Sequence, residues 1–156
     1  MPIRSPLLLV SLSLMMVCSA AAQQPAPEEL RQQVEKTERA FAQTMADRDF
    51  EAFTAHLAEE AVFFAGQTPL PGKQRVADTW KPYFDGPDAP FSWEPEVVVV
   101  LESGALALSS GPVRNAEGQR VATFNSIWRL DADGQWRVIF DKGSRDCEDP
   151  ARADGE

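Results

Sequence analysis

Cysteine, histidine and long apolar segments are scarce in this chain of 156 residues, and each shortage excludes a class of protein. Of the two cysteines, Cys18 lies in an N-terminal apolar segment and Cys147 in a polar tail, so we expect no internal disulfide. The single histidine, His56, offers no spacing of metal ligands, and we predict neither a metal site nor a cofactor. No apolar run approaches the roughly 20 residues of a membrane-spanning helix.

Basic residues are also few. The chain has 15 Lys and Arg against 24 Asp and Glu, a formal net charge of −9. Phosphate binding depends on clustered Lys and Arg, so this balance argues against nucleic acid and against anionic membrane surfaces as partners. An acidic, solvated surface of this kind keeps a protein soluble.

The first 22 residues have the pattern of a secretory signal peptide. Arg4 is followed by an apolar run over residues 7–17 and by small residues that end at Ala22. We expect cleavage near Ala22, which gives an exported protein, periplasmic or secreted, without membrane attachment. A lipid anchor on Cys18 is the alternative, but a bacterial lipoprotein signal has a small residue before its cysteine, and here that residue is Val17.

The remainder predicts one domain over residues 28–143, after a linker at 23–27 and before a disordered acidic tail at 144–156. A long amphipathic helix begins at Glu28 and is interrupted at Asp47. Asp49 is placed to cap a second helix, and a third runs from Gly72 to a stop at Pro82. We expect the first helix to have Leu30, Val34, Thr37, Phe41 and Met45 on its buried face, and Arg31, Glu35, Glu38 and Gln43 on its solvent face.

Residues 61–65 predict a short buried strand, and 66–72 a turn or hairpin. After residue 90 the pattern changes to strands, expected at 93–101, 105–114, 121–130 and 136–141. Short connections with a glycine in each turn favour an antiparallel meander. The predicted fold class is therefore α+β, a cone-like curved antiparallel sheet wrapped by three N-terminal helices.

Several stretches, in this order, resemble the nuclear transport factor 2-like superfamily, in its SnoaL-like and ketosteroid isomerase-like branch. They are residues 39–42 with the Asp49-Phe50 corner, residues 57–63, Pro71-Gly72-Lys73, residues 124–129 and residues 133–138. The resemblance spans roughly residues 28 to 143. It implies a pocket on the concave face of the sheet and, often, homodimers packed through the outer face, but no particular reaction.

The resemblance also tests one reaction. Ketosteroid isomerases of this fold use a carboxylate base on the first strand, a tyrosine on the first helix and a protonated aspartic acid on a late strand. The matching positions here hold Ala65, Phe41 and Ser126. None of these can replace the group it stands for, so we expect no steroid isomerisation by that mechanism.

Asp141 is the candidate catalytic residue that remains. Strand alternation places it with Ile139 opposite Trp136, Val138 and Phe140, and the resemblance implies that Ile139 and Asp141 face the pocket. The alternative is an ion pair of Asp141 with Lys142, Arg129 or Arg137.

We interpret Glu59 and Glu60 as solvated turn residues and His56 as a surface or edge residue. The predicted binding residues are Phe41, Ala65, Trp80, Ser126, Trp128, Ile139 and Asp141.

These observations favour a protein that binds a small, largely apolar molecule, without established catalysis. Two alternatives stay open: a small lyase, isomerase or hydrolase that uses Asp141, with or without His56, and a dimeric accessory module without a ligand. We also expect a homodimer, because residues 97–101 are apolar on both sides and the helices cover only the concave face.

Overall fold

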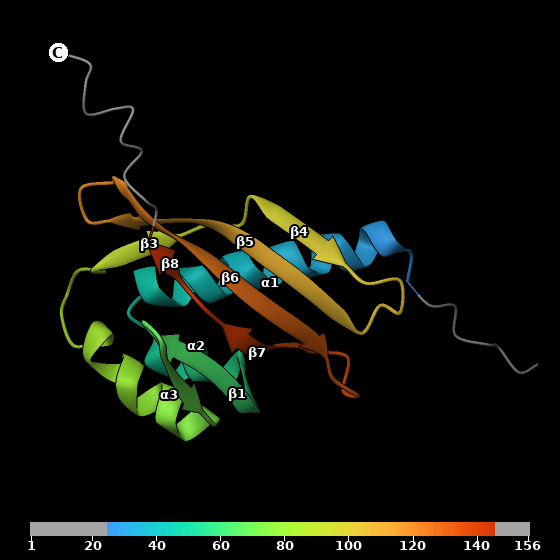
Figure 1. The fold of residues 1–156 in the computed structure, drawn as a ribbon, viewed down its shortest axis with the longest axis horizontal. Coiled ribbons are helices and arrows are strands. Elements are labelled where there is room, and N and C mark those ends of the chain that lie inside the picture. The colour runs from blue at the N-terminus through green and yellow to red at the C-terminus, as the bar shows by residue number, and fades with distance from the viewer. Residues whose placement is uncertain (1–24, 146–156) are drawn as a thin grey trace, which may run out of the picture.

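The computed structural model describes residues 25–145, so the predicted signal peptide with Cys18, and Cys147 in the tail, lie outside the described residues. Within this range the fold is α+β, as predicted, with three helices and a mixed curved sheet (Figure 1). The elements are α1 (Pro27–Ala46), α2 (Phe50–Ala55), β1 (Leu57–Ala65), β2 (Thr68–Pro71), α3 (Lys73–Trp80), the 3-10 helix η1 (Lys81–Phe84), β3 (Phe91–Trp93), β4 (Val97–Val100), β5 (Leu106–Asn115), β6 (Arg120–Leu130), β7 (Trp136–Asp141) and β8 (Ser144–Arg145). No helix in this range is long and apolar enough to cross a membrane.

Local signals fix the helix ends. Pro27 and two acids open α1, and its end is a sharp corner at Arg48, whose φ of 61° lies in the left-handed region. The Arg48 side chain holds this corner by donating to the carbonyl of Gly86 at 3.0 Å and to that of Tyr83. The cap predicted at Asp49 is confirmed, since its Oδ1 accepts from the Ala52 amide at 2.9 Å.

The strand order across the sheet is β2-β1-β7-β6-β5-β3, with β4 also on β5 and β8 also on β6. The meander predicted for the C-terminal half is confirmed, because β5, β6 and β7 pair antiparallel. One pair was not foreseen: β1 lies parallel to β7 and joins the two ends of the domain. Ser144 and Arg145, expected in the disordered tail, instead form β8 against β6.

The strand predicted over 93–101 is two strands in the structure. Pro95 separates β3 from β4, because proline has no amide proton to donate to the ladder. The break passes close over β5 at Gly111, where a Cβ would lie 2.0 Å from the carbonyl oxygen of Glu94. Only glycine fits at this crossing, so β5 supports both short strands.

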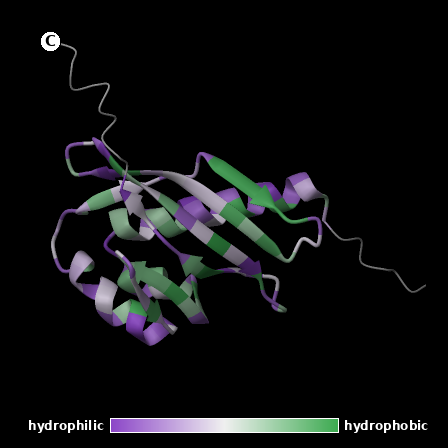
Figure 2. Ribbon diagram, viewed as in Figure 1, coloured by the Kyte–Doolittle hydropathy of each residue, from purple (hydrophilic) through white to green (hydrophobic). Residues whose placement is uncertain are grey.

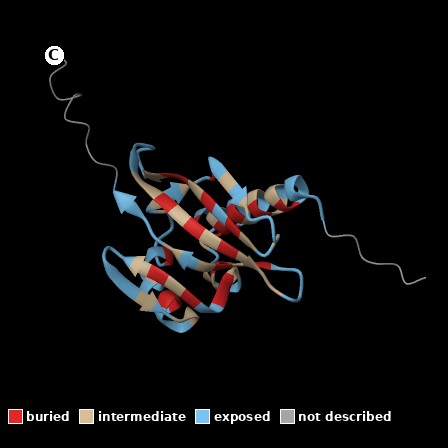
Figure 3. Cartoon of the chain, turned by 45° about the vertical axis from the view of Figure 1, so that its right-hand side comes forward, coloured by how far each residue is buried: buried red, intermediate tan, exposed pale blue. Residues whose placement is uncertain are grey.

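The helices lie on one face of the sheet, which we call the inner face. The first helix packs against β3, β4 and β5, and α3 packs against β1. Buried residues alternate with more exposed ones along the long strands (Figure 3), as a half-covered sheet requires. On β4 the alternation leaves Val97 and Val99 about half exposed, although the whole strand is hydrophobic (Figure 2).

Candidate functional site

A row of polar side chains crosses the inner face in the middle of the sheet. Asp141 on β7 is the cross-strand neighbour of Ser126 on β6, which is the neighbour of Ser109 on β5. Apolar residues continue the row at both ends, with Phe63 beside Asp141 and Val98 beside Ser109. We call Ser109, Ser126 and Asp141 the inner polar row; both serines are fully buried and Asp141 is half-buried.

Hydrogen bonds join only part of this row. The Ser126 hydroxyl donates to Asp141 Oδ2 over 2.7 Å. The Ser109 hydroxyl is completely buried and has no hydrogen-bond partner among the residues described. The polar group that faces it is Glu38, whose pKa the Ser109 and Ser126 hydroxyls act to lower.

Glu38 of α1 faces the row, which corrects the prediction that it lies in solvent. Its side chain is fully buried, and its two carboxylate oxygens accept from the indole nitrogens of Trp93 at 2.9 Å and Trp128 at 2.7 Å. The reason is helical spacing: Glu38 follows Val34 by four residues and precedes Phe41 by three, so it lies within the apolar stripe that packs on the sheet.

Two carboxyl groups, those of Glu38 and Asp141, lie in this site. Neither Glu38 nor Asp141 forms an ion pair within residues 25–145. Burial raises the pKa of Asp141 to about 7, the Ser126 hydrogen bond opposes that rise, and the nearby Glu38 charge adds to it. Burial also raises the pKa of Glu38, against the effect of the two indole donors and of the Ser109 and Ser126 hydroxyls. Because the two groups share one interior, ionisation of either one opposes ionisation of the other.

A shift of register in β7 turns Asp141 inward. Ile127 pairs with Phe140 and Trp128 with Val138, so Ile139 is left without a partner on β6. Phe140 is therefore exposed, as predicted, and Asp141 faces the inside.

The predicted place of Trp136 on the outer side is wrong, because simple alternation takes no account of this bulge. Trp136 is buried in the core with Val138, on the N-terminal side of Ile139.

The ion pair considered for Asp141 is not formed. Arg129 donates instead to Glu60 and Asp131, and Arg137 to Asp131 and Asp133. The ammonium of Lys142 lies 5.2 Å from the ring centre of Phe64. Among residues 25–145, Ser126 is the hydrogen-bond partner of Asp141.

Most predicted binding residues lie in or around this interior, but in different roles. Phe41, Ser126 and Trp128 are sealed from solvent, so they support the site rather than line an open pocket. Trp80 is half-buried; its ring lies 5.5 Å from that of Phe63, the neighbour of Asp141. Ala65 is exposed at the β1–β2 turn, paired with Thr68, and Ile139 is the half-buried bulge residue.

The other titratable candidates stand apart from the inner polar row. Glu59 and Glu60 are exposed, as expected, and pair with Lys73 and Arg129. His56 is half-buried between α1 and β7, its ring 5.3 Å from that of Phe41. Among the described residues no group of His, Cys, Asp or Glu is arranged to hold a metal ion.

Comparison with known proteins agrees with this architecture. A family model of the SnoaL-like domain matches residues 38–139. A nuclear transport factor 2-like protein of unknown function from Pseudomonas putida superposes with a TM-score of 0.64 at 21% identity, over 80% of this chain and 92% of that one. A proposed dehydratase of the same family from Streptomyces avermitilis has a TM-score of 0.64 at 18% identity, over 79% and 100%. A ketosteroid isomerase-like protein from Erwinia carotovora atroseptica has a TM-score of 0.59 at 20% identity, over 77% of this chain and 98% of that one.

The chain therefore belongs to the SnoaL-like family, and its fold is that of nuclear transport factor 2-like proteins. At these identities the solved structures establish the fold alone. Among curated protein sequences, none matches this chain.

Proposed function

We propose that this protein binds a small, largely apolar molecule on the inner face of its sheet, with Asp141 as the polar anchor. The proposal rests on one observation: a half-buried carboxyl group, without a cation partner in the part of the chain that the structure describes, faces inward beside aromatic rings. Because the pKa of Asp141 is raised to about 7, both protonation states are present at neutral pH. The group can then donate a hydrogen bond to a carbonyl or accept one from a hydroxyl.

The aromatic residues at the edge of the interior suit an apolar ligand body. Trp80 is half-buried and contacts the rings of Tyr83 and Phe91, at centroid distances of 5.7 and 5.9 Å. Tyr83 is 45% exposed, so this cluster reaches the surface. Such a wall with one polar group is the usual composition of a small-molecule site.

A homodimer and export form part of the same proposal. An apolar row crosses the outer face, on the opposite side of the sheet from the inner polar row. Its successive cross-strand neighbours are Val99, Leu108, Ile127 and Phe140. Three of them are more than a third exposed. A second copy would cover this row, and the N-terminal pattern supports export with cleavage near Ala22.

An enzyme that uses Asp141 is the second candidate. A carboxyl group whose pKa lies near 7 suits general acid and base catalysis at neutral pH, and the names of two structural relatives refer to a dehydratase and a ketosteroid isomerase. His56 is an unsuitable partner in such a reaction, because the groove that it lines does not include Asp141. The third possibility, an accessory module without a ligand, predicts no binding at all.

Binding of 2-naphthol, a flat apolar molecule with one hydroxyl, tests the proposal. We expect saturable quenching of tryptophan emission, and we expect Asp141→Ala to weaken binding about tenfold through loss of one hydrogen bond. Naphthalene, which lacks the hydroxyl, should bind the two proteins equally. Glu60→Gln, which removes an exposed carboxylate, is the matched control and should bind like the wild type.

Three other results would each contradict the binding proposal. Equal loss of both ligands in an Asp141→Ala protein that is still folded would mean that Asp141 makes no specific contact with the hydroxyl. No binding across a panel of apolar molecules would favour the accessory module. A 5-ene-3-ketosteroid should remain unconverted, and turnover that disappears in Asp141→Asn would favour the enzyme instead.

A further inference from the structure

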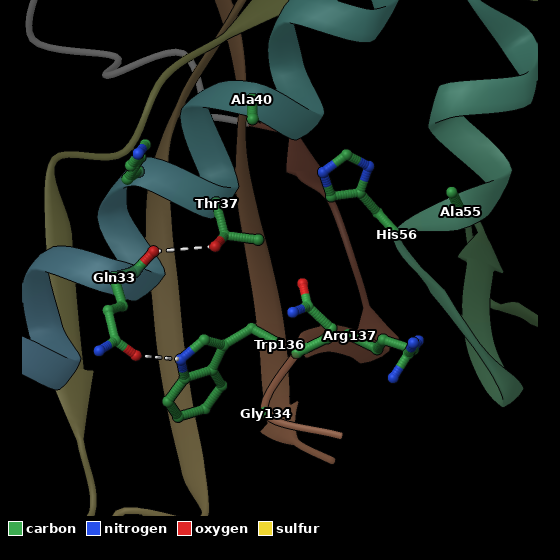
Figure 4. Close-up of a pocket in the computed structure, with 10 residues that line it drawn as sticks. Gln33, Thr37, Ala40, Ala55, His56, Gly134, Trp136 and Arg137 are labelled. Atoms are coloured by element: carbon green, nitrogen blue, oxygen red, sulfur yellow. Dashed lines mark hydrogen bonds between the residues drawn. The ribbon is translucent and has the colours of Figure 1, made fainter. Parts of the chain in front are cut away.

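A groove of about 680 Å³ lies between α1 and the start of β7, beside the end of α2 (Figure 4). None of its lining residues belongs to the inner polar row. The groove is lined by Gln33, Lys36, Thr37, Ala40, Ala55, His56, Gly134, Gln135, Trp136 and Arg137. It is therefore a separate site from the one proposed above.

His56 presents a bare nitrogen to this groove. Its Nδ1 lies 2.9 Å from the carbonyl oxygen of Ala52, and a carbonyl can only accept, so Nδ1 carries the proton. Burial lowers the pKa of His56, which keeps the ring neutral at pH 7. Figure 4 shows the ring reaching toward Ala40 of α1, with its second nitrogen turned away from α2. That nitrogen, Nε2, has no hydrogen-bond partner in residues 25–145.

The rings behind His56 fix this orientation. Phe41 and Trp128 lie 5.3 and 6.3 Å from the imidazole centre, and both are buried. A backbone hydrogen bond also holds His56 in place, because its carbonyl accepts from the Val138 amide at 3.0 Å. The lone pair of Nε2 is thus held in place as a hydrogen-bond acceptor.

The groove also has a positive charge that the protein does not neutralise. No acid is among the lining residues, although the chain has a formal net charge of −9. Arg137 is paired with Asp131 and Asp133. Lys36 has no ion pair among the described residues, and Gln32, Gln33, Arg39 and Ala40 occupy the positions one helical turn away from it.

The acceptor and the cation line the same groove. Lys36 and Ala40 are four residues apart on α1, so their Cβ atoms are about 5 to 6 Å apart on one helix face. His56 reaches toward Ala40 from the opposite wall (Figure 4). The methyl side chain of Ala40 leaves the space between them open.

We propose that this groove binds a small hydroxycarboxylate, whose hydroxyl donates to His56 Nε2 and whose carboxylate binds the ammonium of Lys36. A hydroxyl fits a bare acceptor nitrogen, whereas an ammonium or amide ligand would satisfy His56 but would be repelled by, or gain nothing from, Lys36. The absence of acids from the lining residues removes the repulsion that a carboxylate would meet elsewhere on this acidic surface.

The single histidine makes the test direct, because its Cε1 proton gives one unambiguous NMR signal. Glycolate should shift this signal saturably in the wild-type protein. Methoxyacetate keeps the carboxylate but has no hydroxyl proton, so we expect its dissociation constant to be about tenfold higher. Lys36→Ala should raise the glycolate dissociation constant by a similar factor, whereas Arg75→Ala, which removes an exposed cation on α3, should not change it.

Each alternative outcome overturns a defined part of the inference. Equal shifts from glycolate and methoxyacetate would exclude the hydroxyl contact. Equal affinity of Lys36→Ala and wild type would exclude the carboxylate contact. No shift with glycolate, while 2-naphthol still quenches tryptophan emission, would exclude the groove as a site and leave the proposed function of the inner face untouched.

Discussion

Replacing Asp141 by asparagine would remove the titratable group of the inner polar row and keep its shape. The asparagine oxygen can still accept from Ser126, as Asp141 Oδ2 does over 2.7 Å. The variant therefore resembles the wild type with Asp141 protonated. Comparing the two proteins across pH isolates the free energy of ionising one buried carboxyl group.

The direction of the effect follows from the raised pKa. The pKa of Asp141 is about 7 in the folded protein, against an ordinary value of 3.8. Between these values the folded state binds more protons than the unfolded state, so stability falls as pH rises through this window. A difference of this size corresponds to about 4 kcal/mol, fully present below pH 4 and lost above pH 7. The raised pKa of Glu38 acts in the same direction.

Urea unfolding followed by tryptophan emission at several pH values would measure this difference. We expect Asp141→Asn and wild type to be about equally stable at pH 4, and the variant to be more stable at pH 8 by up to about 4 kcal/mol. Asp133→Asn is the control: its carboxylate is exposed, and Arg137 lowers its pKa to about 2, so it should not gain stability at high pH. Parallel pH profiles for Asp141→Asn and wild type would refute the raised pKa of Asp141.

Further predictions concern the core, the assembly and processing. Trp128→Phe removes one of the two indole donors to Glu38 and should lower the free energy of unfolding by about 1 to 3 kcal/mol in urea, with an unchanged value counting against this bond. Leu108→Glu should convert a dimer to a monomer in light scattering, and a monomeric wild type would refute the outer-face interface. Intact mass should show a mature chain that begins near Gln23, whereas acylated Cys18 at the N-terminus would contradict the predicted cleavage.

Much of the fold was predictable because its signals are local. The cap at Asp49, the stop near Pro82 and the glycine turns all concern residues that are close in sequence, and short connections predict antiparallel neighbours. The parallel pairing of β1 with β7 brings Leu57 beside Val138. No short pattern encodes contact over such a separation, so this pair could not be predicted.

Glu38 is a site residue that the sequence analysis placed in solvent, although its helical spacing places it on the buried face. The interval of four from Val34 and three to Phe41 places it on the buried stripe, yet its charge favours the solvent face. What resolves the conflict are the indole groups of Trp93 and Trp128, which reach it from β3 and β6. These partners lie far along the chain, so only the folded structure shows that a buried carboxylate is satisfied there.

The bulge at Ile139 determines the chemical character of the whole interior. If Ile139 were instead paired regularly with Ile127, alternation after Val138 would turn Phe140 inward and Asp141 outward. The polar row would then lose its acid to the outer face, and an aromatic ring would close the core. The bulge at Ile139 thus separates a proton-binding interior from a closed apolar one, with the same residues at positions 140 and 141 in both cases.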